Sequence, residues 1–168
     1  MRLPLLPLLL LAAPAGAQDP AHAPQCSNVR VALPPELAGW SQQAPLAAGR
    51  EGRSAGVVSV GRAVALRLQP AASVALVTPS LKEPAAGSYA GLVRLEVAQA
   101  GRYRVALGGG GWIDVVANGS AQDTVAHAHG PACTGIGKMV DFDLKPGRYL
   151  IQLKDAKTAT MPLMVARL

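Results

Sequence analysis

The chain has 168 residues and a formal net charge of +6, and half of its residues are hydrophobic while only 4% are aromatic. A chain of this length can form one domain with a core, and its composition predicts that the core is mainly aliphatic. The basic residues are spread singly rather than gathered on one face with aromatic side chains, which argues against a nucleic-acid-binding protein.

The first residues have the pattern of a cleaved secretory signal. Arg2 supplies a positive charge, an apolar run covers residues 3–13, and Ala15-Gly16-Ala17 has the small residues of a cleavage site. The apolar run is too short to span a bilayer, so we expect no stable membrane insertion. We predict that residues 1–17 are a signal peptide and that the protein is exported to the periplasm or the medium.

A segment rich in proline and alanine follows the predicted signal, over residues 18–52. Prolines at this density remove backbone donors and disfavour helix. We expect this segment to be a loosely ordered leader with a short edge strand at residues 29–33. Residues 53–168 are then expected to form the folded domain.

From Gly56 onward, apolar and polar residues alternate with a period of two. In residues 92–98, for example, valines and leucines alternate with Arg94 and Glu96, which is typical of half-buried antiparallel strands. No stretch has a helical period. We predict an all-β fold, a single antiparallel β-sandwich or jelly roll of about nine short strands. The stretches that supply them are Val57–Val60 leading into Val64–Leu68, then Val74–Thr78, Leu92–Ala98, Arg102–Leu107, Trp112–Ala117, Thr124–His129, Met139–Leu144, Arg148–Lys154 and Leu163–Arg167.

Two parts of the chain repeat one another. Residues 95–103 (LEVAQAGRY) and residues 142–149 (FDLKPGRY) both run from an expected strand through a glycine-containing turn to Arg-Tyr. In β-sandwiches a tyrosine placed after such a turn packs at a sheet corner and bonds to nearby backbone. We predict this role for Tyr103 and Tyr149.

The segment Leu-x-Pro-Gly-x-Tyr at residues 144–149, together with residues 138–142 (KMVDF), resembles the C-terminal half of pre-peptidase C-terminal-type β-sandwich domains. The chain is also similar to small exported bacterial proteins of unsettled function that share a His-x-His-Gly-Pro-x-Cys segment, here residues 127–133. Some of those proteins are labelled homogentisate 1,2-dioxygenase. The resemblance covers roughly residues 91–168 and implies a β-sandwich, and the dioxygenase label implies an iron site of two histidines and a glutamate.

The two cysteines, Cys26 and Cys133, form an even pair in a chain with an export signal. This predicts a disulfide between them. The bond would tie the start of the mature chain to the loop after His129. The alternative is that Cys133 is a thiolate metal ligand beside the histidines.

A candidate metal site lies in residues 124–144. His127 and His129 are two residues apart in an expected strand, so they share a face, and this spacing occurs at copper, zinc and iron sites. If this strand pairs with the next one, His127 could lie opposite Asp141, and two imidazoles with one carboxylate make an open site. The alternative is a polar strand face on which these residues alternate with buried alanine, valine and phenylalanine.

These observations leave three functions open, and no catalytic residue can be assigned from the sequence. The first is a non-catalytic binding or interaction module for an unknown protein, glycan or small ligand, and we favour it because sandwich folds carry their functions in grafted sites. The second is a periplasmic protein that binds copper, zinc or iron through His127 and His129, completed by Asp141 or Cys133. The third is a metal-dependent oxidoreductase at the same site.

Overall fold

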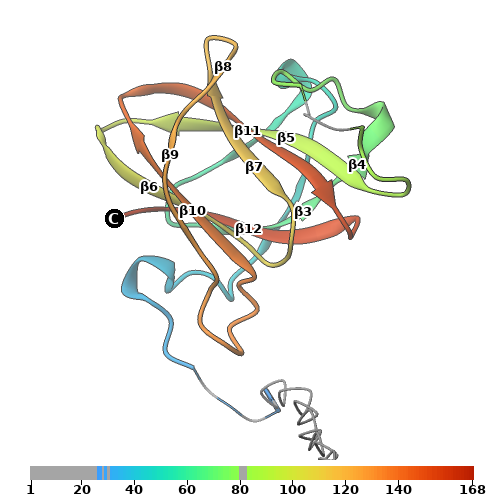
Figure 1. Cartoon of the computed structure of the whole chain (residues 1–168). Helices are drawn as coiled ribbons and strands as arrows, with labels where there is room; N and C mark the ends of the chain where they lie inside the picture. Colours follow the sequence, from blue (N-terminus) through green and yellow to red (C-terminus); the bar gives the residue numbers. More distant parts are fainter. Residues whose placement is uncertain (1–25, 28, 30, 80–82) are drawn as a thin grey trace, which may run out of the picture.

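The computed structural model describes residues 26, 27, 29, 31–79 and 83–168. The predicted signal peptide lies outside these residues, and so does His22, the remaining histidine of the chain, which the sequence left open as a further metal ligand. In the described residues the chain forms twelve strands, three short 3-10 turns and no α-helix, and two mixed sheets pack together as a β-sandwich (Figure 1). The alternating sequence pattern predicts this all-β fold correctly. The described part of the chain contains no helix that is long and apolar enough to cross a membrane.

The first sheet, sheet A, has six strands in the order β1-β3-β12-β6-β10-β9. Their bounds are β1 Ala44–Ala47, β3 Ala63–Arg67, β6 Gly101–Leu107, β9 Thr124–Ala128, β10 Lys138–Leu144 and β12 Thr160–Arg167. Neighbouring strands are antiparallel except β1 and β3, which run parallel.

The second sheet, sheet B, has the order β2-β5-β11-β7-β8, and β4 also pairs with β5. Their bounds are β2 Gly56–Val58, β4 Gln69–Pro70, β5 Tyr89–Val97, β7 Trp112–Ala117, β8 Ser120–Ala121 and β11 Gly147–Ala156. Strands β2 and β5 run parallel, whereas the other pairs are antiparallel. Both sheets are therefore mixed, which corrects the expectation of a purely antiparallel sandwich. A period of two marks a strand but says nothing of the direction of its neighbour.

The main core lies between the sheets and is built by the predicted alternation. On β5 the inward residues Val93, Leu95 and Val97 are at most 2% exposed, while Arg94 and Glu96 on the opposite face are exposed. The core is mainly aliphatic, and the only phenylalanine of the chain, Phe142, is buried in it. Burial of apolar surface of this kind is the main force that holds the two layers together.

Part of the expected leader folds onto the outer face of sheet A. The 3-10 turn η1 (Pro35–Leu37) and Trp40 form a second apolar cluster with side chains of the sheet, among them Met139 and Met164. Strand β1 lies in the same part of the chain. These findings correct the expectation of a loosely ordered leader for residues 33–52. The prolines are compatible with this because η1 begins at a proline and because Pro45 lies on an edge strand, where a missing donor is tolerated.

Two expected strands do not form. Residues 74–78 have no strand structure, and this segment instead crosses the outer face of sheet B, where side chains hold it. The expected edge strand at residues 29–33 lies partly outside the described residues, and its described residues are not in a strand.

The two tyrosines occupy the predicted sheet corners. The hydroxyl of Tyr103 donates to the carbonyl of Gln99 at 2.7 Å. The hydroxyl of Tyr149 donates to the carbonyl of Lys145 at 2.9 Å and accepts from its backbone N–H at 3.1 Å. Both rings are buried. The repeated turn therefore has the same physical role in both places, which is to fix a strand entry by a bond four residues back.

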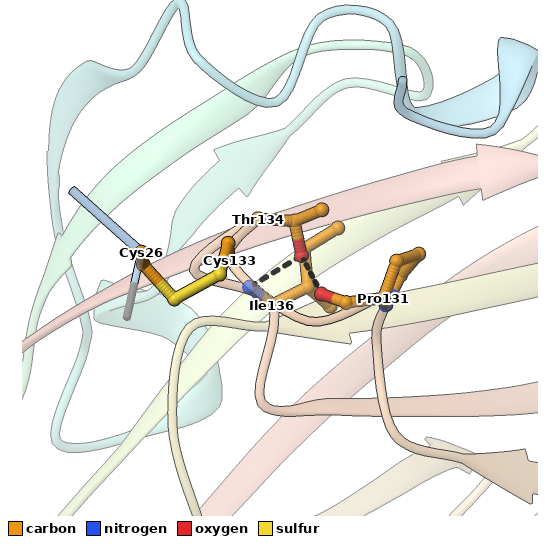
Figure 2. The surroundings of a disulfide bond; sticks show 5 residues. All are labelled: Cys26, Pro131, Cys133, Thr134 and Ile136. Atoms are coloured by element: carbon orange, nitrogen blue, oxygen red, sulfur yellow. Dashed lines mark hydrogen bonds between the residues drawn. A yellow bond between two sulfur atoms is a disulfide. The ribbon is translucent and has the colours of Figure 1, made fainter. Parts of the chain in front are cut away.

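Figure 2 shows the predicted disulfide between Cys26 and Cys133, whose Cα atoms are 5.1 Å apart. The loop that carries Cys133 is closed by Thr134, whose hydroxyl donates to the carbonyl of Pro131 at 2.7 Å and accepts from the N–H of Ile136 at 3.2 Å (Figure 2). The indole N–H of Trp40 also donates to the Thr134 carbonyl, at 3.0 Å. Because Cys133 is oxidised, the alternative of a thiolate metal ligand does not apply.

Candidate ligand-binding site

The predicted metal ligands are not brought together. Strand β9 pairs with β10 so that His127 lies opposite Val140, and Ala126 lies opposite Asp141. Directly paired residues share a face of the sheet, so His127 and Asp141 lie on opposite faces. The expected pairing of His127 with Asp141 is therefore wrong, because the true register differs by one residue and one residue shifts every side chain to the other face.

Asp141 has a structural role on the outer face of sheet A. The residue as a whole is only 5% exposed, and its carboxylate accepts two hydrogen bonds from Arg104, Nε to Oδ1 at 2.8 Å and Nη2 to Oδ2 at 2.9 Å. Arg104 also donates from Nη1 to Glu36 of η1 at 2.9 Å. These bonds raise the pKa of Arg104 above its ordinary value, chiefly through the hydrogen bond to Asp141. Asp141 thereby links η1 to the sheet.

The histidines also differ from the expectation. Nδ1 of His129 lies 2.9 Å from the carbonyl oxygen of Gly137, and since a carbonyl can only accept, this nitrogen carries the proton and closes the loop between β9 and β10. All five residues of β9 are exposed, including the alanines that the alternative of a polar strand face took to be buried. In the described part of the chain no group of three histidine, cysteine or acidic side chains is placed to hold a metal ion.

A pocket of about 330 Å³ lies on the outer face of sheet B. Its lining comes from strands β2, β5, β7 and β11, from the 3-10 turn η2 (Gly52–Ser54) and from the segment at Val77. The volume falls at the lower end of the range of about 300–1,000 Å³ for small-molecule sites. A second hollow, at Cys26 and the loop 130–137, has no charged residue in its lining.

Two apolar side chains form the floor of this pocket. Leu150 on β11 and Val116 on β7 are direct cross-strand partners. Both project away from the main core, because their strand neighbours Tyr149, Ile151 and Val115 are buried in it. Val116 is 3% exposed, and Leu150 is partly exposed. The same face carries Arg94 and Glu96 on β5 and Arg148 on β11, so apolar and charged side chains lie next to one another in this pocket.

Three charged side chains border the floor. Arg94 lies opposite Leu150, and Glu96 lies opposite Arg148. Nε of Arg94 donates to the carbonyl of Ala55 at 2.9 Å, which anchors its guanidinium beside the floor. The side chains of Glu96 and Arg148 are exposed, and neither makes an ion pair or a side-chain hydrogen bond within the part of the chain that the structure describes.

A buried glutamine fixes the wall of the pocket. Gln152 is fully buried on the outer face of sheet B, where its Oε1 accepts from the N–H of Val77 at 2.7 Å and its Nε2 donates to the carbonyl of Thr78 at 2.9 Å. The Nε2 group also donates to Asp114 at 3.0 Å. Backbone groups that would otherwise lack partners are thereby satisfied, and the segment is held against the sheet although it forms no strand.

Sequence reasoning missed this pocket. It treated Arg94 and Glu96 as part of a solvated face, which is the usual meaning of such alternation. A signal was present in Val116 and Leu150, which are apolar at outward positions of their strands. Their meaning depends on β7 and β11 being neighbours, and this pairing joins segments that are far apart in the chain.

No protein-family model matches the chain, and neither does any curated protein sequence. The similarity drawn from residues 127–133 and 144–149 therefore stays an expectation.

Proposed function

We propose that the protein is a non-catalytic binding module whose ligand lies in the pocket on the outer face of sheet B. The observation that carries the proposal is the apolar floor of Leu150 and Val116, bordered by Arg94, Glu96 and Arg148. Ligand sites typically combine an apolar lining with a few polar groups that orient the ligand. Here the floor would bury the apolar part of a ligand, and the charged border would select its head group.

The supports of the pocket favour binding without rearrangement. The floor lies on strands in the middle of sheet B, and Gln152 holds the wall at Val77. A site that is already formed does not lose affinity to the ordering of loops. Such a module also suits an exported protein, which is consistent with the disulfide in the described residues. We therefore propose that the ligand is met in the periplasm or the medium.

We put forward no metal-dependent function beside this one. His127 and Asp141 lie on opposite faces of sheet A, and Asp141 is engaged by Arg104. A copper, zinc or iron site at these residues has no geometric support in the described part of the chain.

The proposal is tested by screening a diverse library of small amphipathic molecules against ¹⁵N-labelled protein by NMR. We expect binders to shift the backbone signals around Leu150 and Val116. In Leu150→Arg, which places a long cation on the floor, the affinity of these binders should fall at least tenfold. Val125→Arg is the matched control, because Val125 is 42% exposed on β9 of the other sheet.

Two outcomes would reject the proposal. One is a library in which no compound shifts the signals around Leu150 and Val116. The other is a set of binders whose affinities are the same in Leu150→Arg and Val125→Arg. Circular dichroism on both variants would show that the fold is retained.

A further inference from the structure

We infer that the pocket takes a zwitterion with an apolar side chain, such as a hydrophobic α-amino acid. The inference rests on the binding function proposed above and names the class of its ligand. It follows from the signs and positions of the three charges at the border, from the floor between them and from the size of the pocket.

The two arginines flank the single glutamate. Glu96 is two residues from Arg94 on the same face of β5, and it lies directly opposite Arg148 on β11. Neighbouring positions of this kind are about 4.5–7 Å apart. The three head groups can therefore reach one small ligand, and within the described residues neither Glu96 nor Arg148 is engaged by another side chain.

This arrangement discriminates against ligands of one charge. A simple carboxylate held by Arg94 and Arg148 would also lie beside Glu96, which repels it, and a simple amine at Glu96 would lie beside two guanidinium groups. A molecule with a carboxylate and an ammonium group a few ångströms apart can match all three charges at once. Arginine suits the carboxylate end, because its planar N–H groups bind carboxylates in pairs.

The floor and the volume restrict the rest of the ligand. Leu150 lies opposite Arg94 on one side and Val116 on the other, so an apolar side chain can lie on these two residues while the charged head stays at the border. The pocket, at about 330 Å³, is near the lower limit for small-molecule sites. Both features favour a molecule of the size of leucine over a lipid or an oligosaccharide.

The test compares four probes on the full mature protein by NMR titration. L-leucine carries both charges, N-acetyl-L-leucine lacks the ammonium, L-leucinamide lacks the carboxylate, and glycine lacks the apolar side chain. We expect L-leucine to bind most tightly and each of the other three to bind about tenfold more weakly, the factor that corresponds to one lost interaction of ordinary strength.

Charge-removing variants assign the two ends of the ligand. Glu96→Gln should weaken L-leucine binding about tenfold and leave N-acetyl-L-leucine unaffected or tighter. Arg148→Gln should weaken both of these ligands and not L-leucinamide. Asp123→Asn and Arg62→Gln are the matched controls, because both residues are exposed outside the pocket lining, and neither should change any affinity.

The inference and the proposed function fail in different ways. If L-leucine does not bind, binds no better than its three analogues, or binds equally well to Glu96→Gln, the zwitterion class is wrong. Library compounds that still shift the signals around Leu150 and Val116 would then leave the binding function standing. If no compound of any class shifts those signals, both are overturned.

Discussion

Asp141 offers the sharpest test of how the outer face of sheet A is stabilised, because strand β10 contains its own control. Asp141 and Asp143 each accept two hydrogen bonds from the arginine directly opposite on β6, Arg104 and Arg102 respectively. The two pairs differ in burial. The Asp141 side chain is 8% exposed, whereas that of Asp143 is 60% exposed.

Asp141→Asn should therefore destabilise the protein much more than Asp143→Asn. Removing one partner from a buried ion pair costs about 3–5 kcal/mol, because the other charge is left uncompensated. Arg104 is 19% exposed and keeps its bond to Glu36, which offsets part of this cost. We expect a loss of about 2–3 kcal/mol for Asp141→Asn. Asp143→Asn should change the unfolding midpoint only slightly, since water screens an exposed pair.

Equilibrium unfolding in urea at neutral pH measures both changes, and the slope of the transition shows whether the unfolded state has altered. Fluorescence of Trp40, which packs beside η1, would report whether η1 leaves the sheet first in Asp141→Asn. Equal midpoints for the two variants would refute the reasoning that burial decides the strength of these pairs. So would an unchanged midpoint in Asp141→Asn.

Three further predictions concern pH, the disulfide and the pocket wall. The hydrogen bond from Arg102 lowers the pKa of Asp143, so the stabilisation from this pair is present above the carboxyl's ordinary pKa and is lost as pH falls through the lower, folded-state pKa. The urea unfolding midpoints of wild type and Asp143→Asn should therefore converge on acidification, and a difference between the midpoints that widens would contradict this sign. Replacing Cys26 and Cys133 by serine should lower the free energy of unfolding by at most about 4–5 kcal/mol, the chain-entropy value for a loop of this length, and a reducing agent should then have no further effect on the melting temperature. Gln152→Leu removes the hydrogen bonds that hold the wall of the pocket and should lower the free energy of unfolding by about 1–3 kcal/mol, with faster amide hydrogen exchange at Val77 and Thr78. Unchanged exchange at these two residues would show that other contacts hold the wall.

Local patterns predicted the features that depend on neighbours in the chain. The period of two identified the inward residues of β5, and the repeated turn identified the corner roles of Tyr103 and Tyr149, because each of these patterns is contained within a few consecutive residues. The disulfide was predicted from the even cysteine count together with the export signal. What failed was the direction of β2, which was expected in an antiparallel sheet and pairs in parallel with β5; a parallel partner is chosen by the whole sheet and leaves no local mark. Strand β1, which lies in the expected leader, was not predicted.

The leader shows how composition misled the prediction. Its prolines suggested a loosely ordered segment, but Leu37 and Trp40 carry enough apolar surface to cover the outer face of sheet A. That face could not be recognised in advance as apolar. Its outward-facing methionines and alanines, such as Met164 and Ala106, are buried beneath this segment. In the sequence they occupy strand positions that look the same as positions facing the main core.

The predicted metal site and the pocket on sheet B show that the chemistry of a residue and its place in the sheet have to be considered separately. His127, His129 and Asp141 have side chains well suited to metals, and a one-residue difference in register was enough to put His127 and Asp141 on opposite faces. The residues of the pocket have ordinary side chains, and three strands that are distant in the chain place Arg94, Leu150 and Val116 in one row. The residue types therefore indicated a metal site that the strand register does not form. They gave little sign of the pocket on sheet B, which the register does form. In a sandwich of short strands, the pairing of the strands has to be known before the chemistry of a residue can be used to assign a function. In the sequence, the feature that most merits attention is an apolar residue at an outward strand position, because its neighbours on the adjoining strands decide whether it lines a pocket.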